Sequence, residues 1–330
     1  MVENLIVIAL GGNALLQRGQ KGTFEEQYQN VRSTVSKIAD LIQRGHKVVM
    51  VHGNGPQVGA TLLRHEAAKN IVPSFPLDAC GAETQGFIGY MIQQALRNEL
   101  KSRGIDKFVV TIITRVIVDK HDSAFQHPTK PIGPFYSRTD AEEKRRTLGW
   151  QIVEDAARGY RRVVPSPEPL EIVELDLIRD LVEAGALIVC TGGGGIPVLR
   201  EEGTLRGVEA VIDKDRASAV LASQLSVDLF AISTDTDFVY VNYKKPNQSP
   251  ILRATASELE AHHREGHFPP GNMGPKVESV LNFLCHGGKE AIITSFEHLA
   301  EAVKGSAGTH IVPDPISLSS YEEVEVLTCR

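Results

Sequence analysis

Three lysines of this 330-residue chain stand in settings that restrict them more than an ordinary surface lysine. Lys130 lies in the segment PTKPIGP, Lys214 stands between Asp213 and Asp215, and Lys276 follows the residues NMGP. A surface lysine normally points into solvent, whereas neighbouring prolines, glycines and carboxylates constrain these three. Phosphoryl transfer needs such point charges at the oxygens of the moving group. The lysines therefore indicate phosphoryl transfer, and the two aspartates have a simpler alternative role as helix caps.

Glycine clusters follow three apolar segments at points where we expect strands to end. They are Gly11-Gly12, Gly53-Asn54-Gly55 and Gly192 to Gly195. Ligands of open α/β sheets bind at the carboxyl ends of the strands. Glycine lets the backbone approach an anion closely and direct several N–H groups toward it. One such cluster is most simply a tight turn, but three at equivalent strand ends favour a phosphate or carboxylate site.

Other familiar site motifs are absent from the sequence. No G-x-x-x-x-G-K-[ST] segment occurs, which excludes a P-loop protein. The spacing of Gly53, Gly55 and Gly59 differs from that of a dinucleotide-binding turn. The pair His65-Glu66 lacks the second histidine of a zinc protease because Lys69 stands in its place. We therefore expect this pair on a solvated helix face.

The elements that must position these residues alternate along the chain. Six continuously apolar segments predict strands covered on both faces: Leu5–Leu10, Val48–Val51, Phe108–Ile113, Ala186–Cys190, Leu229–Ile232 and Ala291–Ile293. Amphipathic stretches lie between them, with apolar faces that include Tyr28 to Ile42, Phe87 to Leu96, Ala217 to Leu225 and Val277 to Leu284. This alternation predicts an α/β fold, a three-layer αβα sandwich with a mainly parallel central sheet.

One region, from about residue 115 to 169, interrupts this alternation. It is rich in proline and contains the single tryptophan, Trp150. We interpret it as an inserted, protruding subdomain or lid, because long excursions in compact domains usually serve a function. The alternative is an ordered surface excursion without a function.

Composition limits the classes of function. The formal net charge is −6, hydrophobic residues make up 42% and charged residues 23%, which is typical of a globular protein. An acidic chain without a basic run argues against nucleic-acid binding. Four scattered cysteines without zinc-ligand spacing, and no apolar segment long enough to cross a membrane, predict a cytoplasmic protein that does not contact a membrane.

Seven segments of the chain together resemble carbamate kinase. They are ALGGNAL from Ala9, HGNGPQVG from His52, PTKPIGPFY from Pro128, RVVPSP from Arg162, GGGGIPV from Gly192, GVEAVIDKD from Gly207 and MGPKVE from Met273. The match runs in order over about residues 4–315. The wider group has the amino-acid kinase fold, whose other members usually carry a lysine just before the first Gly-Gly. Here that place holds Ala9-Leu10, and in carbamate kinases a lysine of the protruding subdomain, matched by Lys130, replaces it.

The resemblance implies a reversible reaction, ATP + carbamate ⇌ ADP + carbamoyl phosphate, with Mg²⁺ accompanying the nucleotide. It implies an ATP-forming step in the breakdown of arginine or purine-derived carbamoyl phosphate, and a homodimer with an eight-stranded sheet. The kinase domain would span residues 1–315, with the carbamate and phosphoryl site in its N-terminal half and the nucleotide at about 210–315. Residues 316–330 would form a tail, most simply a frayed terminus.

The resemblance also implies roles for individual residues. Backbone and amide groups would hold carbamate and the transferred phosphoryl group, from Gly11, Gly12, Asn13, Gly53 and Asn54. Lys130, Lys214 and Lys276 would cover the bridging and equatorial oxygens, and Asp215 would orient lysines through charge-assisted hydrogen bonds. The nucleotide pocket would be formed by Asp213, Thr234, Asp235, Tyr240, Met273 and Gly274. Tyr240 and Met273 have an equally strong alternative as ordinary core residues, and no dedicated protein metal site is expected.

Some positions depart from the family pattern, notably Glu83, Ser123 and Asn272. The three lysines and Asp215 are present, so these departures bear on nucleotide affinity and lid mobility rather than on activity. Two rivals remain at this stage. One is another enzyme of this fold that phosphorylates a small carboxylate such as acetylglutamate, and the other is a non-catalytic sensor of carbamoyl phosphate or nucleotide.

Overall fold

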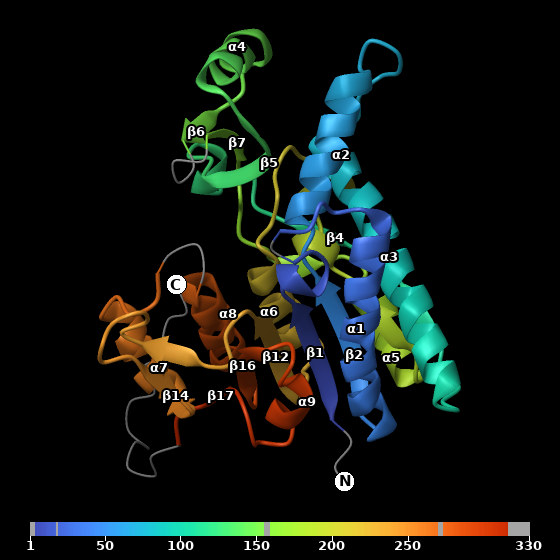
Figure 1. Ribbon diagram of the computed structural model, residues 1–330, viewed down its shortest axis with the longest axis vertical. Helices are drawn as coiled ribbons and strands as arrows, with labels where there is room; N and C mark the ends of the chain where they lie inside the picture. The colour runs from blue at the N-terminus through green and yellow to red at the C-terminus, as the bar shows by residue number, and fades with distance from the viewer. Residues whose placement is uncertain (1–3, 18, 155–158, 270–272, 316–330) are drawn as a thin grey trace.

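A central eight-stranded sheet organises the molecule (Figure 1). The structure is a computed structural model that describes residues 4–17, 19–154, 159–269 and 273–315. The strand order is β15-β17-β16-β12-β1-β2-β9-β3, and all pairs from β16 to β3 are parallel, whereas β17 is antiparallel to β16. The bounds are β1 Leu5–Leu10, β2 Lys47–His52, β3 Val109–Thr111, β9 Leu187–Val189, β12 Leu229–Thr234, β15 Arg253–Thr255, β16 Ala291–Ser295 and β17 Thr309–Val312. The predicted mainly parallel sheet is confirmed.

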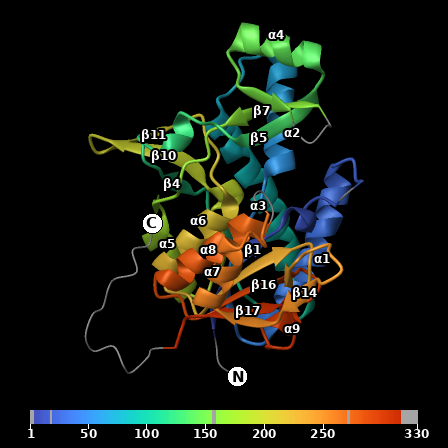
Figure 2. The same ribbon diagram turned by 90° about the vertical axis from the view of Figure 1, so that its left-hand side faces the viewer.

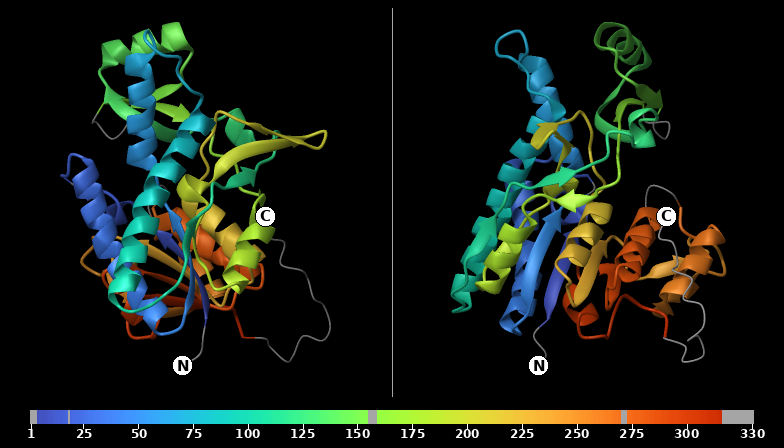
Figure 3. Two further views of the ribbon diagram at one scale, coloured as in Figure 1. Left: turned by 90° about the vertical axis from the view of Figure 1, so that its right-hand side faces the viewer. Right: turned by 180° about the vertical axis from the view of Figure 1, so that it is seen from behind.

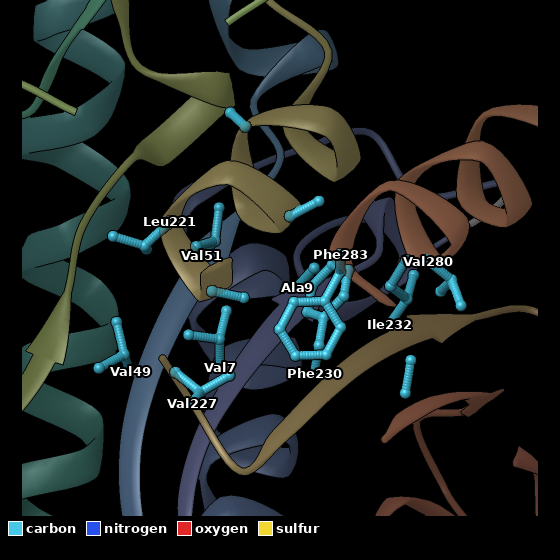
Figure 4. Packing of buried hydrophobic residues seen from close by; sticks show 14 of the residues in the cluster. Val7, Ala9, Val49, Val51, Leu221, Val227, Phe230, Ile232, Val280 and Phe283 are labelled. Carbon is cyan, nitrogen blue, oxygen red and sulfur yellow. The ribbon is translucent and has the colours of Figure 1, made fainter. Parts of the chain in front are cut away.

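Helices cover both faces of this sheet, as the side chains of β1 illustrate. Val7 and Ala9 pack into a core with α5, α6 and α8, part of which Figure 4 shows. Ile6 and Ile8 face the opposite core, with α1, α3 and α9. The bounds are α1 Phe24–Gln43, α3 Leu77–Ser102, α5 Leu175–Glu183, α6 Lys214–Gln224, α8 Met273–Cys285 and α9 Leu299–Ala302. Continuously apolar strands buried on both faces thus give the three layers that the sequence predicts.

Local sequence signals fix where these helices begin. At the start of α1, the Thr23 side chain accepts a hydrogen bond from the Glu26 N–H, and the Glu26 side chain accepts from the Thr23 N–H. This capping box satisfies two backbone donors that the first helical turn leaves unpaired. The helix α4, Arg138–Leu148, begins after the cap Ser137 and ends at Gly149 with a φ of 65°.

Three apolar residues lie elsewhere than the sequence pattern predicts. Phe87 is 36% exposed, because it is one position away from the buried stripe of α3 and instead contacts the ring of Phe24. Phe108 and Ile113 are exposed and lie outside β3, which is a short strand at the edge of the sheet. The expectation that all three are buried is therefore wrong.

The excursion between residues 115 and 169 divides between two small sheets. β5 Lys130–Tyr136, β6 Ile152–Glu154 and β7 Tyr160–Val164 form a three-stranded sheet that carries α4. This part protrudes beside α2, Gly55–Ala68, at one end of the molecule (Figures 1 and 3). The first strand of the excursion, β4 Arg115–Ile117, instead joins β8 Glu171–Ile172, β10 Ile196–Glu201 and β11 Thr204–Gly207 in a second sheet. We call β5, α4, β6 and β7 the protruding subdomain.

The remaining small elements lie near the C-terminal half of the central sheet. β13 Val239–Val241 and β14 Ser249–Ile251 form a hairpin, and α7 spans Ala256–Arg264. The hairpin of β10 and β11 extends away from the body of the molecule (Figure 2). Among the described residues, no helix is both long enough and apolar enough to cross a membrane.

Candidate active site

The first turn of α6 holds the centre of the candidate site. Asp213 caps this helix, and its Oδ1 atom accepts a hydrogen bond from the backbone N–H of Asp215 at 2.9 Å. A carboxylate at this position satisfies a free backbone N–H and is stabilised by the helix dipole. The second oxygen of Asp213, Oδ2, lies 2.8 Å from Lys130 Nζ. The helix-cap role that the sequence allowed for Asp213 therefore coexists with a role in binding a lysine.

Lysine and aspartate side chains form ion pairs in a series that begins in the protruding subdomain and ends at α8. Lys276 Nζ lies 2.8 Å from Asp215 Oδ2, and Lys214 Nζ contacts the other oxygen of the same carboxylate. Lys130 pairs with Asp213. We call these five residues the lysine–aspartate cluster. Three ammonium groups and two carboxylates leave one net positive charge, which a bound anion would balance.

Burial opposed by opposite charge sets the ionisation of this cluster. Burial alone would raise the pKa of Asp215, but Lys214 and Lys276 outweigh it and hold that pKa below its ordinary value. The pKa of Asp213 is also held well below its ordinary value, because Lys130 overcomes the effect of burial. Burial lowers the pKa of Lys214, whereas the Asp215 carboxylate overcomes burial and raises the pKa of Lys276. Both carboxylates are thus ionised at neutral pH and hold the lysines by charge-assisted hydrogen bonds.

Close packing explains the glycines that follow β2 and β9. A Cβ atom on Gly53 would lie 3.5 Å from Lys214 Cδ, and one on Gly193 would lie 2.2 Å from Asn54 Nδ2. The φ of Gly193 is 67°, a left-handed value that favours glycine. Asn54 Nδ2 donates a hydrogen bond to Thr84 Oγ1 at 2.9 Å. The structure therefore brings the predicted residues Gly53 and Asn54 next to the lysine–aspartate cluster.

The turn after β1 packs against the end of β12. The backbone N–H of Gly11 donates to Ser233 Oγ at 3.0 Å, and a Cβ atom on Gly11 would lie 2.7 Å from the Ser233 carbonyl oxygen. Gly12 and Asn13 follow in a short 3₁₀ helix and are exposed. This turn therefore lies beside Thr234. The residues predicted to bind carbamate are thus adjacent to those predicted to bind the nucleotide.

His52 lies in the site but was not among the residues predicted from the sequence. It ends β2, is 1% exposed, and its Nδ1 atom lies 2.9 Å from the Gly53 carbonyl oxygen. Burial, with a smaller contribution from the positive charge of Lys214, lowers the pKa of His52 to about 4. A Cβ atom on Gly192 would lie 2.4 Å from His52 Nε2, so a neutral ring packs directly against the third glycine cluster. Its position directly before Gly53 and Asn54 could have indicated from the sequence that it lies in the site.

The proposed nucleotide residues follow β12 and open α8. Thr234 Oγ1 donates to Asp235 Oδ1 at 3.1 Å, and Tyr240 stands on β13 with two aromatic neighbours at 5.9 and 6.3 Å. Met273 is partly buried against the main core, as its alternative role would require. The Gly274 N–H donates to the Pro269 carbonyl oxygen at 3.1 Å. Asn272, one of the departures from the family pattern, lies outside the described residues.

A second polar group at these strand ends went unnoticed in the sequence. Asp237 Oδ1 lies 3.0 Å from His298 Nδ1, and Ser295 Oγ lies 3.0 Å from the same nitrogen. Hydrogen bonds from Ser295 and His298 lower the pKa of Asp237. The three residues are far apart in the sequence, so no motif could have grouped them.

A hollow of about 450 Å³ lies away from this chemistry, between α2, the start of α3 and the protruding subdomain. Its charged groups are paired: Arg162 lies 2.9 Å from Glu209, and His65 lies 3.0 Å from Glu83. The His65 and Glu66 side chains are 17% and 26% exposed, so they lie on a partly solvated face of α2. His65 Nε2 also gives the carboxylate of Glu83, a departure from the family pattern, a hydrogen-bond partner. None of the lysines of the lysine–aspartate cluster lines this hollow.

Comparisons with known proteins agree with this geometry. The sequence profile of the amino acid kinase family matches residues 4–295. The carbamate kinase of Thermococcus kodakarensis is 52% identical over 310 residues, which are 93% of this chain and 98% of that protein. The carbamate kinase of Trichomonas vaginalis is 50% identical over 94% of this chain and 99% of that protein. The chain therefore belongs to the amino acid kinase family.

Solved structures point to the same branch of that family. The carbamate kinase of Giardia lamblia bound to AMP-PNP aligns with a TM-score of 0.90 and 45% identity, over 94% of this chain and 99% of that chain. The predicted amino-acid kinase fold is thus confirmed. Within the family, the near full-length similarity is to carbamate kinases.

Kinases of this family use ATP, and ATP binds as a complex with a divalent cation. The carboxylates of Asp213 and Asp215 are engaged by lysines, whereas Asp235 is exposed at the end of β12. A small hard cation is usually held by phosphate oxygens, waters and one or two carboxylates rather than by a protein cage. The donor set here fits a cation that arrives with the nucleotide.

Proposed function

We propose that this chain catalyses the reversible transfer of a phosphoryl group between ATP and carbamate, as a carbamate kinase. The observation that carries the proposal is the lysine–aspartate cluster at the glycine-rich strand ends. It occurs in a chain about half identical, over nearly its full length, to carbamate kinases. No second function is favoured by a specific observation.

Alignment and charge neutralisation supply the catalysis in this proposal. Carbamate is already a nucleophile, so the reaction needs no covalent intermediate. Gly12 and Gly53 direct backbone N–H groups at carbamate and the moving phosphoryl group, and the amides of Asn13 and Asn54 complete this surface. Gly11, whose N–H is held by Ser233 Oγ, shapes the turn that presents them. The Asn54 amide, held by Thr84, is fixed before substrate binds.

The three lysines cover the oxygens whose charge changes during transfer. Lys214 and Lys276 are held at fixed positions by the two oxygens of Asp215, so little reorganisation is needed in the transition state. Lys130 reaches the same place from the protruding subdomain. We therefore assign Asp215 a positioning role and the three lysines a direct electrostatic role.

The nucleotide occupies the C-terminal half in this proposal. Asp213, Thr234 and Asp235 face its phosphates and ribose, and the pocket for its base is formed by Tyr240, Met273 and Gly274. Mg²⁺ would be held by phosphate oxygens, with Asp235 available to it, and would neutralise charge on the phosphates. Residues 1–315 form the kinase domain, the excursion at about 115–169 acts as its lid, and the tail 316–330 lies outside the described residues.

Cellular context and assembly are further parts of the proposal. The reaction runs toward ATP in the cytoplasm, in the breakdown of carbamoyl phosphate from arginine or purines. The chain forms a homodimer, and exposed aromatic rings on α1 and α3 support this: Phe24, Phe87 and Tyr90 are 43%, 36% and 51% exposed. Tyr90→Glu should convert a dimer to a monomer in light scattering, whereas Leu252→Glu, at an exposed apolar position on another part of the chain, should not.

A direct assay tests the main proposal. The purified chain should form ATP from ADP and carbamoyl phosphate in the presence of Mg²⁺, followed by a coupled enzyme assay. Acetyl phosphate and acetylglutamyl phosphate serve as competing phosphoryl donors for the rival in the same fold. Binding of carbamoyl phosphate without turnover would favour the sensor and contradict the proposal.

A further inference from the structure

The turn that ends α7 brings together two imidazoles and a carboxylate, none of which belongs to the lysine–aspartate cluster. Glu265 Oε2 lies 3.4 Å from His262 Nδ1 and 3.3 Å from His267 Nε2. The two imidazole rings have centroids 5.5 Å apart and planes at 72°. One ligand atom from each residue lies within 4.8 Å of those of the other two. This turn follows the helix α7 in Figure 1.

The backbone explains why these side chains meet. The His267 N–H donates to the His262 carbonyl oxygen at 3.2 Å, and the Gly266 N–H donates to that of His263 at 3.0 Å. Gly266 has a φ of 78°, the left-handed value that this helix ending requires. Together these features form a Schellman motif, in which the residues here occupied by His262 and His267 commonly make a hydrophobic contact. Two histidines at those positions, with a glutamate between them, form a preorganised set of metal ligands.

We propose that His262, Glu265 and His267 bind a transition-metal ion of the zinc class. In a tetrahedral zinc site, metal–ligand distances of about 2.0–2.1 Å place neighbouring ligand atoms about 3.3–3.4 Å apart. Both distances measured from the Glu265 oxygen fall in that range. Two imidazoles and a carboxylate suit zinc, whereas Mg²⁺ prefers an all-oxygen set. The three side chains are 39%, 61% and 22% exposed, so a water can complete the coordination.

One proton must move for this site to form. The Asn242 N–H lies 3.4 Å from His267 Nδ1, so the neutral ring carries its proton on Nε2, facing Glu265. Zinc replaces that proton, Nδ1 takes one from solvent, and the long contact with Asn242 opens. The neighbouring histidine is engaged elsewhere, because His263 Nε2 lies 3.4 Å from Glu278 Oε1 and its ring stacks on Phe268. The metal therefore has three protein ligands.

Metal titration of the full chain tests this site. Protein without an affinity tag is stripped with a chelator, and Zn²⁺ is titrated against a chromophoric indicator without nucleotide. The expected result is one zinc ion per chain, with affinity reduced by about 100-fold or more in His262→Ala and in His267→Ala. His286→Ala is the matched control, since His286 is an exposed histidine at the end of α8 whose Nδ1 contacts a backbone carbonyl. Excess Mg²⁺ should not compete.

Two further measurements keep the result clear. Co²⁺ in place of Zn²⁺ should give the intense visible absorption of a four-coordinate ion, and this absorption should be lost in the double variant His262→Ala/His267→Ala. Circular dichroism should be unchanged in every variant, because the backbone hydrogen bonds that form this turn do not depend on the two imidazoles. Equal zinc affinity in the wild type and the double variant, or binding only at millimolar zinc, would overturn the proposal.

Discussion

The two halves of the lysine–aspartate cluster differ in how firmly they are built. Asp215, Lys214 and Lys276 belong to helices of the main core, and their side chains are 6%, 14% and 13% exposed. Lys130 comes from the protruding subdomain, is 39% exposed, and meets a carboxylate that is 18% exposed. A buried pair loses strong interactions when one partner is removed, whereas an exposed pair is screened by water.

This difference separates a fixed part of the site from one that can leave. The Asp215 carboxylate holds two lysines, one on each oxygen. The Lys130 pair can break at low cost, so the Lys130 ammonium can leave Asp213 without disturbing the core of the cluster. Two of the three positive charges that would bind an anion, Lys214 and Lys276, are therefore held rigidly, and the third, Lys130, is held by a contact that can break.

Replacing the central carboxylate should have the largest effect. Asp215→Asn keeps the shape but removes the charge that holds Lys214 and Lys276. We expect kcat to fall by about 10³-fold or more, and the free energy of unfolding by about 3–5 kcal/mol, because two buried ammonium groups lose their partner. Steady-state kinetics and urea unfolding measure the two effects. A variant with near-normal stability would contradict the buried organising role.

Removing one of the two buried lysines should act mainly on turnover. In Lys276→Ala, Asp215 keeps Lys214 as a partner, so the fold persists and the free energy of unfolding falls by about 1.5–3 kcal/mol. The loss of a charge aimed at the transferred group should lower kcat by about 10²–10³-fold. The measurement is ATP formation at saturating substrates.

A surface lysine offers the matched control for this variant. Lys304→Ala removes a lysine that is exposed after α9, and should leave kcat and stability nearly unchanged. Near-normal kinetics of Lys276→Ala would refute the role assigned to Lys276.

The neutral histidine beside the rigid half predicts a pH dependence. His52 has a pKa of about 4 in the folded chain, and an unperturbed histidine has one of about 6.5. Between these values the unfolded chain binds a proton that the folded chain does not, so stability rises with pH and is lost on acidification. As the pH falls from about 6.5 to about 4, protonation of His52 in the unfolded chain should lower the free energy of unfolding by on the order of 3 kcal/mol.

The variant His52→Gln isolates this contribution. Urea unfolding of both proteins at about pH 7 and about pH 4.5 should show a smaller loss of stability in the variant, by roughly 2–3 kcal/mol. Equal losses in the two proteins would mean that His52 is not buried in its neutral form. Carboxylates are unchanged between the two proteins and do not affect the difference.

Much of the framework could be predicted from the sequence because its signals are local. Continuously apolar segments such as Leu5–Leu10 marked the buried strands, and glycines marked their ends. Each lysine of the cluster stood out through its immediate neighbours. The roles assigned to these residues in the reaction remain predictions.

Other features depend on contacts between distant segments, which local patterns do not encode. Lys130 and Asp213 are 83 residues apart, and nothing near either residue indicates that they pair. β4 joins β10 rather than staying within the protruding subdomain. Phe87 and Ile88 are adjacent and both apolar, but a helix turns about 100° between them, so one faces solvent and the other the core.

The ion pair between Lys130 and Asp213 gives the smallest expected change in stability. It also gives the clearest comparison with Lys276. Lys130→Ala removes an ion pair whose lysine is 39% exposed, and the Asp213 carboxylate keeps the Asp215 N–H as a partner, so the free energy of unfolding should fall by only about 1 kcal/mol. Its turnover should fall about as far as that of Lys276→Ala, because one point charge is lost in each case. The two variants would then match in kcat and differ in stability. If urea unfolding showed Lys130→Ala to be as destabilised as Lys276→Ala, the protruding subdomain would be a fixed part of the core and the division into rigid and releasable halves would fail.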